Sequence, residues 1–468
     1  MSLIDTLRDI VGPSHVLTGS DTARFATDWT GVYSGVPLAV VRPANTGEVA
    51  AVVSAAAESG TAIVPVGGNT GLCGGTYSEG ALAVSLERMN AIREIRPEAR
   101  VAVVEAGVVL DAMHAAAESH GLAFPLTFGA RGSATLGGTL ATNAGGSNVV
   151  RYGSTRALCL GIEVVLPSGE VLDLMAALHK DNSGYDLKDL FIGAEGTLGI
   201  ITAATFKLFP KPAAYATAMV AVPSLADALT LLNRLQEATG GAVEAFEYMD
   251  GRTLETIVGH YDDMRPPFEE TYEVNILVEI GATAPRDATP DDDGSIPVVS
   301  YLEEVLGGML EEEAVLDAVV AQNEAQRAEM WQRRERNAEV ALENPPFVNT
   351  DVCVPLDRVQ VFLDKVAPRL RALDERMEAL CVSHLGDGNI HYTARPSRDD
   401  PDLLDRVLEE VEDLALSLGG SFSAEHGIGK SKLASMRRRK NPVALGVMRQ
   451  IKAALDPKGI MNPGKVLP

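Results

Sequence analysis

The chain has 468 residues, 46% of them hydrophobic and 44 of them glycine, and a formal net charge of −24 at pH 7. This length predicts two or three domains, each able to bury a core. The negative charge argues against nucleic acid or an anionic membrane surface as partner, and no apolar run approaches the ~20 residues of a membrane span. The four cysteines form no CxxC pair, so neither a disulfide framework nor a thiolate metal site is indicated. The first residues lack a basic region and a long apolar run, so we expect no signal peptide and a soluble, cytoplasmic protein.

The first half of the chain begins with a short helix and turns over residues 1–35, followed by a helix at 46–59 that Gly60 ends. A buried strand at 62–66 then leads into residues 67–76, where five of ten residues are glycine. Glycines let successive backbone N–H groups point at one polyanion. The loop matches neither the GK[ST] phosphate-binding motif nor a GxGxxG dinucleotide motif, and on its own it is compatible with an ordinary long turn.

Two further segments share this chemistry. Residues 128–147 repeat the glycine-rich pattern after a helix expected at 109–120, and residues 182–201 form a third small-residue segment. A hairpin over 161–174 is predicted between them. Three such loops set between strands predict a groove shaped for one long ligand that carries phosphates.

After residue 212 the glycine-rich loops disappear and helices alternate with short strands. Helices are expected at 225–238, 321–342 and 357–373, and a last helix is expected to end near Leu455. This alternation of helices and strands predicts one mixed sheet with helices on one face.

The segment SHLGDGNIH at 383–391 is predicted to form strand, tight turn and strand, because its glycines allow positive φ and its Asp and Asn suit turn positions. Such a turn would bring His384 and His391 side by side. With Glu425 they would form a set of two imidazoles and one carboxylate that leaves open positions on a divalent metal, as catalytic sites do. The alternative interpretation is that His384, His391 and the neighbouring His426 are three unrelated histidines, one capping a turn and two on a surface.

The motifs PVGGNTGLCGG, GARGSATLGGTLATNAGGS and NSGYDLKDLFIGAEGTLGIIT resemble the flavin-binding domain of the vanillyl-alcohol oxidase/p-cresol methylhydroxylase superfamily. With HLGDGNIH, EHGIG and MNPGKVL, nearly the whole chain resembles its FAD-linked D-2-hydroxyacid dehydrogenases, which include D-2-hydroxyglutarate and D-lactate dehydrogenases and the flavin subunit of glycolate oxidase. The resemblance implies an α+β fold: a two-part FAD-binding domain of the p-cresol methylhydroxylase type and an α+β cap domain with a mixed or antiparallel sheet. The expected parts are an N-terminal helical segment (1–35), the FAD-binding domain (36–212), the substrate or cap domain with the metal site (213–455) and a C-terminal tail that returns to the FAD domain (456–468).

The resemblance also implies FAD, with its diphosphate on the first loop and the flavin flanked by the second. The positions carried over are Val66, Gly67, Gly68, Asn69, Thr70, Gly71, Leu72, Gly74, Pro125, Gly132, Ser133, Gly137, Gly138, Asn143, Gly145, Gly146, Glu195, Gly196, Ile200 and Asn462. The first two loops contain no histidine that would tether the flavin, so we expect non-covalent FAD. Cys73 is interpreted as a small packed thiol rather than a tether.

Substrate residues follow from the family pattern WxxRE within MWQRRER, which implies that Arg334 binds the substrate carboxylate, with Arg333 as the fallback. His384 and His391 are expected to bind both the substrate and, with Glu425, the metal. His426 is expected to take the hydroxyl proton as general base. Zinc is expected from the ligand types, with manganese and iron(II) as alternatives.

Three positions depart from the 2-hydroxyglutarate enzymes. Ala338 stands in place of a Thr, Asn349-Thr350-Asp351 in place of Lys-Tyr-Asp, and Thr393 in place of an Asn. Losing the Lys removes a cation suited to a second carboxylate, and residues 350–355 resemble D-lactate dehydrogenases instead.

The expected reaction is oxidation of a D-2-hydroxy acid, of the D-lactate or D-2-hydroxyglutarate type, to the 2-oxo acid, with hydride transfer to flavin N5. The electron acceptor would be a quinone, a cytochrome or an electron-transfer flavoprotein, and a homodimer is compatible with the sequence. Three alternatives stay open: a glycolate-oxidase-like flavin subunit that needs partner proteins, a metal-dependent hydrolase whose loops hold a phosphorylated substrate, and a flavin-storing module without catalysis.

Overall fold

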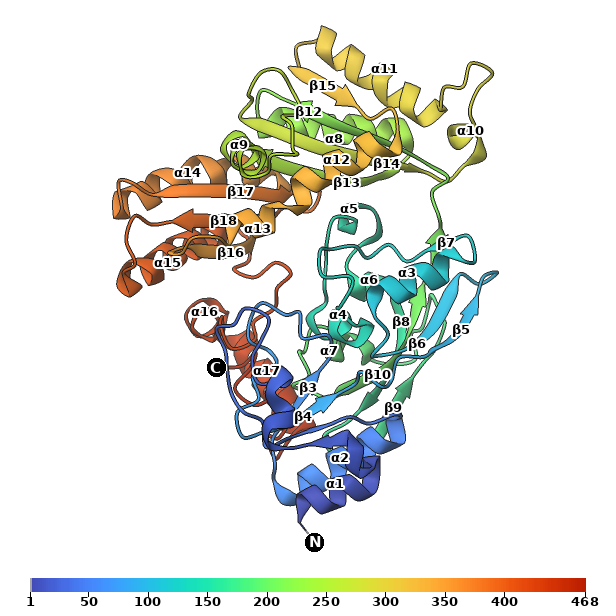
Figure 1. Ribbon diagram of the computed structural model, residues 1–468, viewed down its shortest axis with the longest axis vertical. Coiled ribbons are helices and arrows are strands. Elements are labelled where there is room, and N and C mark those ends of the chain that lie inside the picture. Colours follow the sequence, from blue (N-terminus) through green and yellow to red (C-terminus); the bar gives the residue numbers. More distant parts are fainter. Residues whose placement is uncertain (1) are drawn as a thin grey trace. The chain divides into compact units, whose positions relative to one another are not determined.

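The computed structural model describes residues 2–468, which form two compact units. Unit 1 holds the chain up to Gly145, Ser154–Pro210 and Glu425–Pro468, and unit 2 holds Gly146–Gly153 and Lys211–Ala424. The chain therefore rejoins unit 1 at Glu425, earlier than the boundary expected at residue 456. Figure 1 labels most elements of each unit.

The first sheet of unit 1 has the strand order β1-β2-β4-β3, in which β2, β4 and β3 are parallel and β1 is antiparallel. Its strands are β1 (Val16–Leu17), β2 (Ala39–Val41), β3 (Ile63–Val66) and β4 (Leu82–Ser85). Helices α1 (Leu3–Val11) and α2 (Thr46–Ser59) contribute to its apolar core. The side chain of Asn45 caps the start of α2, and Gly60, with φ of 66°, ends it as the sequence predicted.

The second sheet of unit 1 is antiparallel throughout, in the order β5-β6-β10-β8-β9. Its strands are β5 (Ile92–Arg96), β6 (Val101–Glu105), β8 (Cys159–Val165), β9 (Val171–Leu174) and β10 (Ile200–Lys207). The predicted hairpin at 161–174 is confirmed as β8 and β9. The smaller elements are β7 (Leu122–Ala123), β11 (Phe209–Pro210), α3 (Leu110–Glu118), α4 (Leu136–Thr142), α6 (Thr155–Leu158), α7 (Lys188–Phe191), α16 (Leu433–Arg439) and α17 (Pro442–Leu455).

Unit 2 is built on a seven-stranded sheet in the order β15-β12-β14-β13-β17-β18-β16, with every neighbouring pair antiparallel. Its strands are β12 (Ala214–Ala221), β13 (Val243–Asp250), β14 (Val274–Ala282), β15 (Asp317–Val320), β16 (Val348–Cys353), β17 (Glu378–His384) and β18 (Asn389–Arg395). The sheet is antiparallel rather than mixed because β14 lies between β12 and β13, which the alternation of helices and strands would otherwise place side by side.

Helices pack on both faces of this sheet, so the expectation of helices on one face is wrong. Alternate residues of a strand point to opposite faces, and Phe246 and Met249 of β13 lie in two different apolar clusters. The helices of the first cluster are α8 (Leu225–Thr239), α11 (Pro297–Glu311), α14 (Val359–Leu373) and α15 (Pro401–Ser417). Those of the opposite face are α9 (Gly251–His260), α12 (Glu324–Glu335) and α13 (Asn337–Ala341).

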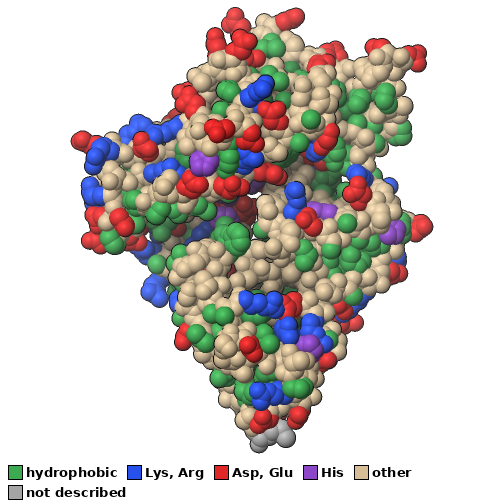
Figure 2. Space-filling view, in the orientation of Figure 1, with side chains coloured by type: hydrophobic (Ala, Val, Ile, Leu, Met, Phe, Trp, Pro, Cys, Tyr) green, Lys and Arg blue, Asp and Glu red, His purple; other side chains and the backbone are tan. Residues whose placement is uncertain are grey.

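Acidic side chains are spread over the face seen in Figure 2, with basic side chains between them, rather than gathered in one patch. Across residues 2–468, helices long and apolar enough to cross a bilayer are absent.

Candidate active site

The predicted strand, turn and strand around SHLGDGNIH is confirmed as β17, a four-residue turn and β18. The carbonyl of His384 accepts hydrogen bonds from the backbone N–H groups of Asp387 and Gly388, both at 3.1 Å. Gly388 has φ of 82°, and a Cβ there would lie 2.2 Å from the carbonyl oxygen of Val354, so this position requires glycine. The turn places the rings of His384 and His391 with their centroids 5.3 Å apart.

A carboxylate from a third strand faces His391. Asp351 of β16 is paired with His391 of β18 in the sheet register. The backbone N–H of Ala424 donates to the carbonyl oxygen of Asp351 at 3.1 Å and to its Oδ2 at 3.2 Å. Glu425 and His426 follow Ala424 directly in the sequence.

Asp351, His391, Glu425 and His426 each offer a ligand atom, and these atoms all lie within 4.8 Å of one another. Two imidazoles and two carboxylates form a donor set that suits zinc or another divalent ion. The residues present therefore fit a divalent metal.

This group differs from the predicted ligand set at three positions. It includes His391 and Glu425 as expected, and also His426, which was predicted as the base. Asp351 was not among the predicted ligands, and His384 is absent from the group. Nδ1 of His384 instead bonds to Oε1 of Glu247 at 2.8 Å.

Glu247 is a further candidate residue that the sequence did not predict. It lies on β13 opposite His384, its exposed fraction is 0%, and its Oε2 accepts a hydrogen bond from Nε of Arg334 at 2.8 Å. Burial by itself raises the pKa of the Glu247 carboxyl, but the charges of His384 and Arg334 outweigh it and hold that pKa below its ordinary value. Because a carboxylate only accepts, Nδ1 of His384 donates, and Nε2 is the nitrogen that can bind a metal or take up a proton.

The two candidate arginines on α12 have different surroundings. Arg334 keeps a buried Nη2 with no hydrogen-bond partner among residues 2–468. Arg333 donates from Nε to the carbonyl of Arg265 at 2.8 Å and from Nη2 to Glu329 at 2.5 Å. A buried guanidinium nitrogen without a partner is costly, so the surroundings of Arg334 fit a ligand carboxylate and those of Arg333 fit a structural role. The single helix predicted at 321–342 is interrupted at Arg336, between α12 and α13.

Apart from Ala338, the positions that depart from the 2-hydroxyglutarate pattern lie along β16 and β18. Asn349 and Thr393 are paired across β16 and β18, two register positions from Asp351 and His391 and therefore on the same face of the sheet. Their side chains bond to each other, with Thr393 Oγ1 donating to Asn349 Oδ1 at 3.1 Å. The Asn349–Thr393 pair carries no charge. The remaining position, Ala338, lies in α13.

In unit 1 the first two glycine-rich loops pack backbone to backbone. A Cβ on Gly68 would lie 2.0 Å from the carbonyl oxygen of Ser133, and one on Gly67 would lie 2.5 Å from Oγ1 of Thr135. That Thr135 hydroxyl is buried and has no hydrogen-bond partner within the described chain. An unsatisfied hydroxyl between two glycine-rich loops fits a polar cofactor such as FAD.

Four of the predicted FAD residues have side chains that form hydrogen bonds to other residues of unit 1. Glu195 accepts hydrogen bonds from the backbone N–H groups of Ile428 and Gly429 at 2.7 and 2.8 Å, and burial raises its pKa. Asn462 donates from Nδ2 to the carbonyl of Glu195 at 2.8 Å. The others are Asn143, which accepts from Ser154 and the Arg156 N–H, and Asn69, which donates to the carbonyl of Thr27.

The remaining predicted FAD residues lie in or beside these loops. They are Val66, Thr70, Gly71, Leu72 and Gly74 around the first loop, Pro125, Gly132, Gly137, Gly138 and Gly145 around the second, and Gly196 and Ile200 before or at β10, while Gly146 belongs to unit 2. Cys73 is buried, and its Sγ donates to the carbonyl of Gly427 at 3.5 Å.

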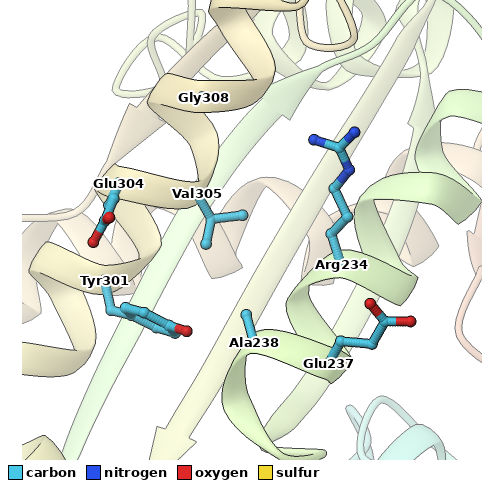
Figure 3. A pocket seen from close by; sticks show the side chains of 7 residues that line it. All are labelled: Arg234, Glu237, Ala238, Tyr301, Glu304, Val305 and Gly308. Atoms are coloured by element: carbon cyan, nitrogen blue, oxygen red, sulfur yellow. The ribbon is translucent and has the colours of Figure 1, made fainter.

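A surface groove between α8 and α11 is separate from these residues (Figure 3). Its lining includes Arg234, Tyr301 and Val305, and Arg234 is paired with Glu312 at 2.6 Å. Both helices cover one face of the sheet, and Met249 and Val382 lie on the other. Glu247 and His384 are two residues from these on the same strands and so share their face. The groove is therefore no part of the candidate site.

Two family models match the chain: FAD linked oxidases, C-terminal domain, over residues 211–466, and FAD binding domain, over residues 37–175. D-2-hydroxyglutarate dehydrogenase, mitochondrial, of Bos taurus is 37% identical over 445 residues, which cover 94% of this chain and 79% of that protein. D-2-hydroxyglutarate dehydrogenase of Xanthomonas citri pv. viticola is 35% identical over 453 residues, which cover 96% and 93% of the two chains.

Solved structures match the fold. Substrate-bound p-cresol methylhydroxylase has a TM-score of 0.75 at 17% identity and covers 99% of this chain and 96% of its own. The 4-ethylphenol oxidase of Gulosibacter chungangensis has a TM-score of 0.72 at 21% identity, with 100% and 97% covered. The predicted α+β fold of the p-cresol methylhydroxylase type is therefore confirmed.

Proposed function

Since this chain belongs to the FAD-linked D-2-hydroxyacid dehydrogenases of the vanillyl-alcohol oxidase/p-cresol methylhydroxylase superfamily, we propose that its oxidation of a D-2-hydroxy acid also requires a divalent metal and a carboxylate anchor at Arg334. The chain is an FAD-dependent oxidoreductase, so the hydrolase alternative is wrong. FAD accepts the hydride when it is bound.

The observation that carries the proposal is the buried Nη2 of Arg334, which has no partner in the described chain although Nε of the same guanidinium is bonded to Glu247. A substrate carboxylate would supply the missing acceptor, in the charge-assisted geometry that a guanidinium fork favours. His384, on the strand beside β13, bonds to the same Glu247 carboxylate.

We propose that Asp351, His391 and Glu425 of the four-residue group hold the ion. Although His384 is outside that group, its ring lies 5.3 Å from that of His391 between centroids, and we propose its Nε2 as a further ligand, with the fourth member of the group, His426, acting as the base. A divalent ion held there would supply Lewis-acid chemistry, which lowers the pKa of the substrate hydroxyl. His426 would take the hydroxyl proton, so replacing it with Gln should slow reduction of the flavin about 10²- to 10⁴-fold. Zinc stays the expected ion, with manganese and iron(II) as alternatives.

Two substrate classes have support. The Bos taurus and Xanthomonas relatives are named as D-2-hydroxyglutarate dehydrogenases, which favours a dicarboxylate. The neutral Asn349–Thr393 pair favours a short uncharged side chain, as in D-lactate, because it offers no cation to a second carboxylate.

Anaerobic bleaching of the visible flavin absorbance tests the proposal. The panel is D- and L-lactate, D-2-hydroxyglutarate, D-malate and glycolate, each with and without a chelator. We expect a D-hydroxy acid to bleach the flavin, chelation to slow bleaching, and His384→Ala to abolish it while FAD stays bound. Unchanged bleaching after verified metal removal would reject the metal requirement, and no bleaching by any D-hydroxy acid would favour the flavin-storing module.

The electron acceptor is proposed to be a quinone, a cytochrome or an electron-transfer flavoprotein. A glycolate-oxidase-like subunit would turn over only with partner proteins, whereas this protein is expected to turn over alone with an artificial acceptor. The cytoplasmic location and the homodimer stay predictions, and the Bos taurus relative is named as mitochondrial.

A further inference from the structure

We infer that Glu247 is a positioning residue that fixes His384 and Arg334 in their working orientations, so that one buried carboxylate couples metal binding to substrate binding. The inference rests on the proposed function, since it assigns His384 to the ion and Arg334 to the substrate.

The geometry divides the carboxylate between two partners. Oε1 accepts from Nδ1 of His384 at 2.8 Å, and Oε2 accepts from Nε of Arg334 at 2.8 Å. The Glu247 side chain is 1% exposed, and those of His384 and Arg334 are 11% and 12% exposed. Water therefore competes weakly for these bonds, and the three side chains constrain one another.

For His384, the bond to Glu247 selects the tautomer. Histidines that bind metals commonly donate their second ring N–H to a carboxylate, which fixes the ring and raises the basicity of the other nitrogen. Glu247 and His384 are cross-strand partners on β13 and β17, so the orientation is set by the sheet itself rather than by a loop.

For Arg334, the bond at Nε leaves the terminal nitrogens for a ligand. A guanidinium held at Nε keeps a fixed plane, and a fixed plane determines where a carboxylate can bind with two parallel hydrogen bonds. Nη2 of Arg334 is one of these terminal nitrogens, and it is buried without a hydrogen-bond partner in residues 2–468.

A second buried glutamate provides a matched comparison. Glu279 lies on β14, next to β13, and is 4% exposed. It accepts hydrogen bonds from Arg327 at 2.6 and 2.8 Å and from Trp331 at 2.8 Å. Arg327 and Trp331 are on α12, the helix that carries Arg334, and a third donor, Thr217 Oγ1 on β12, lies at 2.7 Å. Glu279 therefore anchors α12 to the sheet and has no candidate site residue among these partners.

The test compares Glu247→Gln with Glu279→Gln in the full-length protein loaded with FAD. A glutamine at 247 can accept from only one of the two donors, because its amide nitrogen is itself a donor. We expect Glu247→Gln to keep FAD and to bind Zn²⁺ about 10- to 100-fold more weakly, as loss of an outer-shell partner typically does. The acid that binds the wild type, D-lactate or D-2-hydroxyglutarate, should also bind more weakly to Glu247→Gln. Zn²⁺ is measured by elemental mass spectrometry after dialysis against graded free Zn²⁺, and the acids by titration of the oxidised flavin spectrum.

Glu279→Gln should lower the melting temperature and leave Zn²⁺ affinity within about twofold of the wild type. In the His384→Ala background, Glu247→Gln should cause no further loss of Zn²⁺ affinity, because its effect is transmitted through His384. Wild-type Zn²⁺ and acid affinities in Glu247→Gln would overturn the inference, as would an equal Zn²⁺ loss in Glu279→Gln or additive losses in the double variant. A wild type that binds no Zn²⁺ would instead reject the metal requirement of the proposed function.

Discussion

Asp351 and His391 face each other across β16 and β18, and each contributes a ligand atom to the four-residue group. Replacing Asp351 with Asn removes one anionic donor. We therefore expect Asp351→Asn to lower the affinity for Zn²⁺ at least about tenfold, measured by dialysis and elemental analysis. Asp364→Asn, at an exposed position of α14, is the control and should retain the wild-type metal content. Equal metal content in both variants would remove Asp351 from the ligand set.

The close packing of the first glycine-rich loop predicts unequal effects of two alanine substitutions. A Cβ at Gly68 would lie 2.0 Å from the carbonyl oxygen of Ser133, whereas one at Gly71 would meet no heavy atom within 4 Å. Gly68→Ala should therefore destabilise the FAD-free protein by about 1–3 kcal/mol, the usual cost of overpacking, and Gly71→Ala should leave it unchanged. Thermal unfolding of the FAD-free variants measures this difference, and equal melting temperatures would contradict it.

The histidine turn was predictable because its information is local. Gly388 and the polar turn residues are consecutive in the sequence, and the turn alone brings His384 near His391. The glycine-rich loops and helix ends such as Gly60 were predictable for the same reason.

Glu247 and Asp351 were not predictable in their roles because these depend on the order of strands. Glu247 meets His384 only because β13 pairs with β17, which follows more than a hundred residues later. The insertion of β14 between β12 and β13 likewise has no local signal. The available indication of a buried charge was a glutamate in the middle of the apolar stretch Ala245-Phe246-Glu247-Tyr248-Met249.

The different partners of Arg333 and Arg334 predict different consequences of substitution. Arg334→Lys loses the fork and should weaken binding of the hydroxy acid about 10-fold or more, since hydrogen bonds to charged groups contribute about 1.5–3 kcal/mol. Arg333→Lys loses its bonds to Arg265 and Glu329 and should lower the melting temperature instead. Titration of the oxidised flavin spectrum and thermal unfolding separate the two effects. The assignment would be reversed if Arg333→Lys alone weakened binding.

Asp250 at the start of α9 predicts a pH dependence of stability. Its Oδ1 accepts a hydrogen bond from the backbone N–H of Thr253, but burial is the larger effect and raises the pKa of Asp250 to about 6. In the unfolded chain an aspartate has a pKa of about 3.9. The folded protein thus binds this proton more tightly, so the contribution is stabilising below pH 4 and is lost as the pH rises to 6.

Asp250→Asn keeps a cap acceptor but cannot ionise. The melting temperature of this variant relative to the wild type should therefore increase between pH 4 and pH 7 and then level off. Thermal unfolding of both proteins across pH 4–8 measures the difference, with Asp364→Asn as the control for loss of an exposed carboxylate. A difference that is constant over this range would show that Asp250 ionises alike in the folded and unfolded chains, and that the hydrogen bond to Thr253 offsets its burial.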